Sequence, residues 1–76
     1  MIKELDHVAL TTDLPSENLA AGDLGTVVHV HKGGTAFIVE FLTLRGNTIA
    51  VTTLKKNQIR AVSGREVAHA RDFSKA

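Results

Sequence analysis

The sequence contains no cysteine, no tryptophan and no tyrosine among its 76 residues, and each absence excludes a class of site. Without cysteine, the chain has no disulfide, no thiolate nucleophile and no cysteine-ligated zinc site, which fits a reducing cytoplasm. Without tyrosine and tryptophan, it lacks the side chains that line the grooves of domains that bind proline-rich peptides. We therefore exclude proline-rich ligands.

Long hydrophobic runs are also missing. No segment reaches the roughly 20 apolar residues that a membrane-spanning helix needs. The N-terminal stretch MIKELDHVALTTD carries two acidic residues within its first six positions and no apolar run of signal-peptide length. We expect a soluble, cytoplasmic protein.

Aromatic residues are few, because the three phenylalanines are the only ones in the chain. A chain of 76 residues forms one domain, and its core must therefore rest mainly on valine, leucine and isoleucine. The 43% of apolar and 22% of charged residues are the proportions of a folded domain and not of a disordered chain.

Charge is unevenly distributed along the chain. Residues 1–31 hold one basic and five acidic residues, whereas residues 32–76 hold eight basic and three acidic residues. This asymmetry indicates either a surface for an anionic partner or two halves that lie beside each other and cancel. We favour the second interpretation.

Apolar and polar residues alternate with a period of two through most of the chain, as in half-buried strands. In residues 26–31, this places Val28 and Val30 on one face, with Val27, His29 and His31 on the other, solvated face. In residues 48–54, it separates Ile49 and Val51 from Ala50. The five predicted strands cover residues 7–11, 26–31, 36–41, 48–54 and 58–62.

The predicted connections are a long polar loop, two glycine turns and one tight turn. Residues 32–34 (KGG) and 45–47 (RGN) are able to supply the positive φ angles of hairpin turns. Residues 55–57 (KKN) have room only for a tight or 3₁₀ turn. This order predicts an all-β fold, a small five-stranded antiparallel SH3-like barrel over residues 1–62.

Residues 63–76 form a C-terminal extension with two possible structures. Ser63 and Glu66 have the spacing of a capping box, which would open a short helix over Val67, Ala70 and Phe73. The stretch EVAHAR also alternates as a strand would. We expect a short helix or strand followed by a flexible tail.

Gly22, Asp23 and Gly25 stand where the long loop becomes a strand. Their spacing is similar to that of a phosphate-binding loop, but such a loop needs a helix N-terminus directly after the glycines. We therefore interpret the glycines as structural and Asp23 as the organiser of a turn.

Four segments carry a resemblance to a known family: DLP at 13–15, AGDLGTVV at 21–28, VEF at 39–41 and TL…QIR at 53–60. Over roughly residues 3–70, the chain resembles a bacterial family classed as domain of unknown function 4926. The resemblance implies a small SH3-like barrel that serves as an accessory subunit, with no assigned catalytic residue. Toxin-like neighbouring genes in the family imply a neutralising role, as an antitoxin or immunity protein.

The long loop is the predicted protein-binding surface, because leucines in and around it could form an apolar anchor with an acidic rim. The partner is another protein, such as a toxin-like enzyme. The alternative is that these leucines close the barrel's own core, and an exposed strand edge could also support a homodimer. The predicted binding residues are Asp13, Leu14, Glu17, Leu19 and Asp23.

Nucleic acid is the alternative partner. If the strands run up and down, Lys32, Lys55 and Lys56 fall at one end of the barrel, with Arg60 following on the last strand. Such a group of basic residues could bind phosphates, although no exposed aromatic platform accompanies it.

His29 and His31 form an H-x-H pair that would suit zinc, with His7 as the third ligand. The simpler interpretation, which we favour, is a solvated strand face without metal. No cofactor is expected. No serine or threonine stands in a nucleophile motif, and the carboxylates are scattered, so we expect no enzymatic activity.

Overall fold

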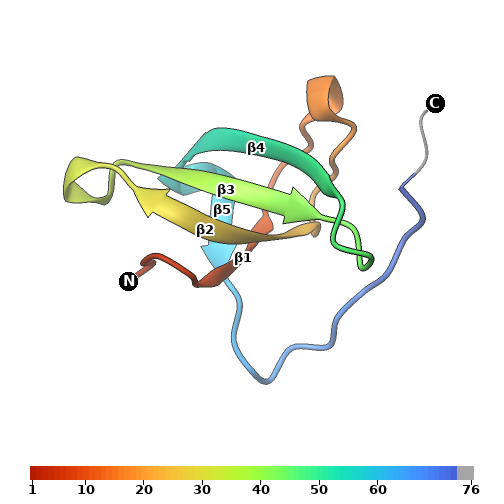
Figure 1. Cartoon of the computed structure of the whole chain (residues 1–76). Helices are drawn as coiled ribbons and strands as arrows, with labels where there is room; N and C mark the ends of the chain where they lie inside the picture. The colour runs from red at the N-terminus through yellow and green to blue at the C-terminus, as the bar shows by residue number, and fades with distance from the viewer. Residues whose placement is uncertain (74–76) are drawn as a thin grey trace.

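The computed structural model describes residues 1–73, which form five antiparallel strands in one sheet (Figure 1). This confirms the all-β prediction. Apart from three single 3₁₀ turns, the described residues contain no helix, and hence none that is long and apolar enough to cross a membrane. The strands are β1 (His7–Leu10), β2 (Leu24–Val30), β3 (Ala36–Leu42), β4 (Thr48–Lys55) and β5 (Ile59–Ala61); the 3₁₀ turns are η1 (Pro15–Glu17), η2 (Lys32–Gly34) and η3 (Lys56–Gln58).

The strand order in the sheet is β4-β3-β2-β1-β5. The sheet curls, so that β1 and β5 pass behind the other three strands in Figure 1. No ladder joins β4 to β5 within residues 1–73, and the barrel is therefore not closed by hydrogen bonds. Both strands are edges.

The short connections are as predicted. Gly33 at φ 72° and Gly46 at φ 90° supply the left-handed conformations that let the two hairpins reverse. The tight turn before β5 is the 3₁₀ turn η3, in which the Gln58 side chain accepts a hydrogen bond from the Lys55 N–H (2.8 Å).

The core lies inside the curl of the sheet. The alternation of Phe37, Val39 and Phe41 predicts the buried face of β3 correctly. On β4, the buried residue of the alternating pattern is the small Ala50, and Val51 points outward with 57% of its surface exposed. The buried cluster consists of Val8, Leu10, Leu19, Val27, Phe37, Val39, Phe41, Ala50, Leu54 and Ile59.

The predicted facing of β2 is wrong at Val27 and Val28. Val27 is fully buried, whereas Val28 is 41% exposed. The cause is a β-bulge, because Val27 pairs with Val39 while His29 pairs with Ile38, which leaves Val28 as an extra residue. A bulge shifts the period of two, and a sequence pattern alone does not reveal it.

The predicted helix or strand of the extension is absent from residues 63–73. Glu66 does accept a hydrogen bond from the Ser63 N–H (2.9 Å), as in a capping box, but only one turn forms. Residues 67–73 instead run irregularly past the β3–β4 turn (Figure 1), and together with residues of that turn they line a pocket. The flexible tail predicted at the end of the chain lies, for residues 74–76, outside the described part.

Candidate functional site

Two carboxylates organise the long loop between β1 and β2. Asp13 accepts a hydrogen bond from the Ala21 N–H (2.9 Å), and Asp23 accepts one from the Ala20 N–H (2.9 Å). Both acids therefore satisfy backbone donors of their own loop, as the interpretation of Asp23 as a turn organiser requires. The two carboxylates thereby fix the shape of the loop.

The predicted apolar anchor in this loop is wrong for Leu19. Only 4% of Leu19 is exposed, and it belongs to the core cluster. Leu14 is half-buried and packs against the same cluster, while Glu17 is exposed. Leu19 closes one end of the hydrophobic core, because the loop folds back through the paired backbones of Leu14 and Leu19. Of the predicted binding residues, Asp13 and Glu17 are thus exposed and Leu14 is partly exposed.

Arg71 of the extension binds the long loop, a contact that the sequence analysis did not find. Its Nε donates to Asp23 Oδ1 (2.8 Å), and its Nη2 donates to Asp23 Oδ2 and to the carbonyl oxygen of Asn18 (3.0 Å). The guanidinium holds the pKa of Asp23 below its ordinary value, although partial burial acts in the opposite direction. The opposite charges of the two halves of the sequence were the one signal for such a contact.

Gly25 has a packing role in the core. A Cβ atom at this position would lie 2.5 Å from Val39 Cγ1 and 2.9 Å from Phe41 Cε1. The β2 backbone can lie this close to Val39 and Phe41 only if the residue at this position has no side chain. The glycine is therefore needed at this point of the strand. This supports the structural interpretation of the Gly22–Gly25 segment.

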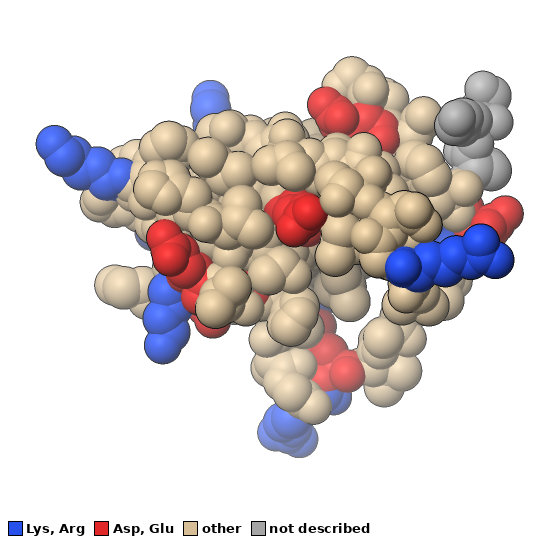
Figure 2. Space-filling view, viewed as in Figure 1, with Lys and Arg blue, Asp and Glu red and all other residues tan. Residues whose placement is uncertain are grey.

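Three of the four predicted basic residues share one end of the molecule. Lys55 pairs with Ala36, directly beside the η2 turn that carries Lys32, and Lys56 follows Lys55. Figure 2 shows basic side chains projecting at this end. Arg60 does not join them freely, because its Nη1 atom lies 2.8 Å from a carboxylate oxygen of Glu66.

The histidine pair lies on an exposed part of β2 and the residue that follows it. The rings of His29 and His31 are 5.1 Å apart, edge to face, and His29 Nδ1 is 3.7 Å from a Glu4 carboxylate oxygen. His7 lies on β1, where it pairs with Thr26 of β2. No three histidine or acidic side chains of residues 1–73 are grouped as metal ligands, so the structure does not bring His7 to the pair.

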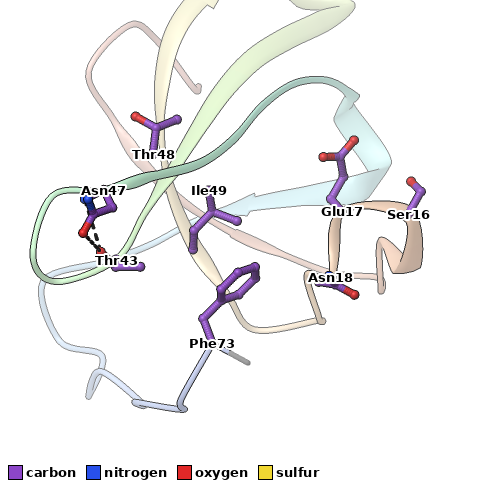
Figure 3. A pocket seen from close by; sticks show the side chains of 8 residues that line it. All are labelled: Ser16, Glu17, Asn18, Thr43, Asn47, Thr48, Ile49 and Phe73. Carbon is purple, nitrogen blue, oxygen red and sulfur yellow. Dashed lines mark hydrogen bonds between the residues drawn. The ribbon is translucent and has the colours of Figure 1, made fainter. Parts of the chain in front are cut away.

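A shallow hollow lies between η1 and the start of β4 (Figure 3). Within it, Thr43 Oγ1 donates a hydrogen bond to Asn47 Oδ1 (3.4 Å) and accepts one from the Asn47 N–H (3.2 Å). In the described residues, no serine or threonine hydroxyl is hydrogen-bonded to a histidine, as an activated nucleophile would be. The expectation of no enzymatic activity stays a prediction. The hollow is lined by Ser16, Glu17, Asn18, Thr43, Asn47, Thr48, Ile49 and Phe73.

β4 is the longer of the two edge strands of the sheet. Its eight residues, TIAVTTLK, carry one charge, at Lys55. Within residues 1–73, the backbone of this strand hydrogen-bonds to no strand other than β3. The neighbouring outward surface is largely uncharged, with Glu40 as the single acid of β2, β3 and β4 (Figure 2).

Comparison with known proteins identifies a family and nothing narrower. The family model described as Domain of unknown function (DUF4926) matches residues 4–61, which contain all five strands. No curated protein and no solved structure matches the chain. Residues 62–73, with Arg71, lie outside the match.

Proposed function

Because the chain belongs to the DUF4926 family, whose description assigns no function, we propose a function from the geometry of its sheet. The chain is a non-catalytic protein-binding module that takes an extended segment of another protein onto the edge of β4. One observation carries this proposal: β4 is long, almost uncharged and, in residues 1–73, unpaired along its outer side.

An edge strand presents a row of N–H and C=O groups that another strand can pair with. In this mode of recognition, main-chain hydrogen bonds supply affinity and alternate side chains supply specificity. β4 is suited to it because its other side is held by β3 over seven paired positions, from Ala36↔Lys55 to Leu42↔Thr48. The partner would therefore meet a preformed strand.

The side chains of β4 define the chemistry of the partner. A residue opposite Val51 would lie on the outer face, beside an exposed valine, and its neighbours would lie on the opposite face, beside half-buried Thr52. The only charge, on Lys55, favours an acidic partner residue at that end. The partner segment is thus extended, with apolar residues at alternate positions and an acidic residue opposite Lys55.

We assign this module an accessory or neutralising role, as an antitoxin or immunity protein that holds a toxin-like enzyme. This role is supported by the family resemblance and by the composition of the β4 edge, which contains no catalytic group. A cytoplasmic partner fits a chain that uses no cysteine.

The test is co-purification of the tagged full-length chain from its native host, compared between two variants. Val51→Lys places a charge in the middle of the β4 edge, whereas Val67→Lys makes the same change at an exposed valine outside the sheet. We expect a stoichiometric protein that is retained by the Val67 variant and lost by the Val51 variant. A partner retained equally by both would exclude the β4 edge as its binding site.

A nucleic-acid-binding function is the second candidate, favoured by the shared position of Lys32, Lys55 and Lys56. Binding of an RNA or DNA oligonucleotide would weaken steeply with added salt. Exchanging Lys55 and Lys56 for glutamine should lower both the affinity and its salt dependence, while Arg45→Gln, at the opposite end, should not. Unchanged affinity in the double variant would rule this face out.

A further inference from the structure

The C-terminal segment 67–73 is held in place by side chains and not by secondary structure. Arg71 makes three hydrogen bonds to the long loop, and Phe73, two residues later, is half-buried in the hollow of Figure 3. In that hollow, Phe73 lies among residues of η1, the β3–β4 turn and the start of β4, including Ile49. The segment is thus attached at two points, an arginine and an aromatic ring.

The groups that receive Arg71 are fixed by the folded body. The Ala20 N–H donates to Asp23 Oδ2 and so orients the carboxylate. Asn18 has a left-handed conformation (φ 59°) at the end of η1, with its N–H bonded to the Pro15 carbonyl oxygen (3.1 Å). A carboxylate that accepts two N–H groups, next to a carbonyl oxygen that accepts a third, complements the planar fork of a guanidinium.

Apolar residues surround this polar pocket. Leu24 and Leu42 are partly exposed beside it, Phe41 and Leu19 form its buried floor, and Ile49 lies under the second attachment point. Because the family match ends at residue 61, the receiving residues lie within the matched body and Arg71 lies outside it. The receptor belongs to the domain, and its occupant belongs to the extension.

We propose that this receptor, formed by Asp23, Asn18 and the Ile49 hollow, binds an extended partner segment that carries an arginine followed two residues later by an aromatic residue. Arg71 and Phe73 occupy it within the same chain and act as a built-in competitor. The site rests on the proposed role in protein binding, but it uses none of the β4 edge residues Val51 to Lys55. It adds a second, sequence-selective contact to that role.

The competition follows from covalent attachment. A segment tethered close to its site has an effective concentration in the millimolar range, which a free peptide must exceed. The natural chain should therefore bind such a peptide poorly, and removal of the two attachment points should open the site. Arginine should be required, because lysine offers a point charge in place of a fork.

The test uses the peptide VAHARDF, with the sequence of residues 67–73, and the full-length chain in natural form and as an Arg71→Ala/Phe73→Ala double variant. Binding is followed by NMR shifts of the Asn18, Asp23 and Ile49 amides. We expect at least tenfold tighter binding to the double variant than to the natural chain. The same peptide with lysine in place of arginine should bind at least tenfold more weakly.

Two controls keep the test independent of folding and of β4. The lysine peptide leaves the protein unchanged, so its weaker binding cannot come from unfolding. Val51→Lys, added to the double variant, should leave the peptide affinity unchanged, even if the β4 proposal fails. Equal binding to both chains, equal binding of both peptides or no binding at all would overturn the receptor.

Discussion

β4 and β5 are both edges of the same sheet, but they differ in length, charge and cover. β5 has three residues, Ile59–Ala61, and its central Arg60 is ion-paired with Glu66 of the turn that follows. β4 has eight residues and a single charge at its end. Short edge strands with charged side chains resist pairing with other chains, whereas long uncharged ones invite it.

One edge of this small domain is therefore protected, and the other is left open. The protection of β5 is local in the sequence, since Arg60 and Glu66 are six residues apart. Among residues 1–73, no ion pair covers β4 in this way, although a charge at Val51 would cost the core nothing because that side chain points outward. We therefore connect binding to β4 and stability to the core that both edges share.

The largest expected effect is on that shared core. Leu19→Ala should lower the free energy of unfolding by about 2–5 kcal/mol, the usual cost of truncating a buried leucine, because Leu19 lies in the central cluster. Leu24→Ala, at a partly exposed leucine five residues away, should cost much less. Urea unfolding measures both. Equal losses of unfolding free energy in the two variants would mean that Leu19 does not contribute to the core as a buried residue.

Gly25→Ala should have the next largest effect, about 1–3 kcal/mol of destabilisation, as is typical of overpacking. Gly25 lies on β2, opposite Val8 of β1. β2 is the middle strand of the sheet, between β3 and β4 on one side and β1 and β5 on the other. The added Cβ would displace Val39 and Phe41 and so disturb both edges. The matched control is Gly64→Ala, since no atom lies within 4 Å of a Cβ there. If both variants unfold at the same urea concentration, the close approach at Gly25 is not a constraint.

A substitution on either edge strand should leave the free energy of unfolding almost unaltered. Its effect on self-association should differ between β4 and β5. Val51→Lys should slow self-association of the concentrated pure chain several-fold, because a charge in the middle of an open edge opposes pairing. Ala61→Lys on β5 should change it little, since that edge is already short and charged. Light scattering during incubation measures the rate. If the Ala61 variant slows association as strongly, the two edges are equally open.

The parts of this fold that could be predicted are those with local causes. Strand alternation in residues 36–41 and the turn glycines Gly33 and Gly46 each depend on a few neighbouring residues, and the structure confirms them. The bulge at Val28 could not be predicted, because it depends on the register between β2 and β3.

The candidate sites were harder to predict because they depend on contacts between distant residues. Leu19 stands among polar loop residues, and its burial depends on how the loop folds back over the core. Arg71 and Asp23 are 48 residues apart, and only the charge asymmetry of the two halves indicated that these halves meet. The placement of Lys32, Lys55 and Lys56 at the same end of the fold needed only the order of up-and-down strands, and the pairing of Lys55 with Ala36 agrees with it.

The smallest expected effect is electrostatic, at the protected edge. The Ser63 N–H and then Arg60 stabilise the Glu66 carboxylate, so the pKa of Glu66 lies below its ordinary value of 4.5. These contacts contribute fully above pH 4.5 and are lost as the pH falls through the lowered pKa. An NMR titration of the Glu66 carboxyl carbon should show this shift. Arg60→Gln should restore only part of it, because the larger cause, the Ser63 N–H, remains; Arg45→Gln should restore none. Full restoration in the Arg60 variant would mean that the ion pair alone, and not the Ser63 N–H, lowers the pKa of Glu66.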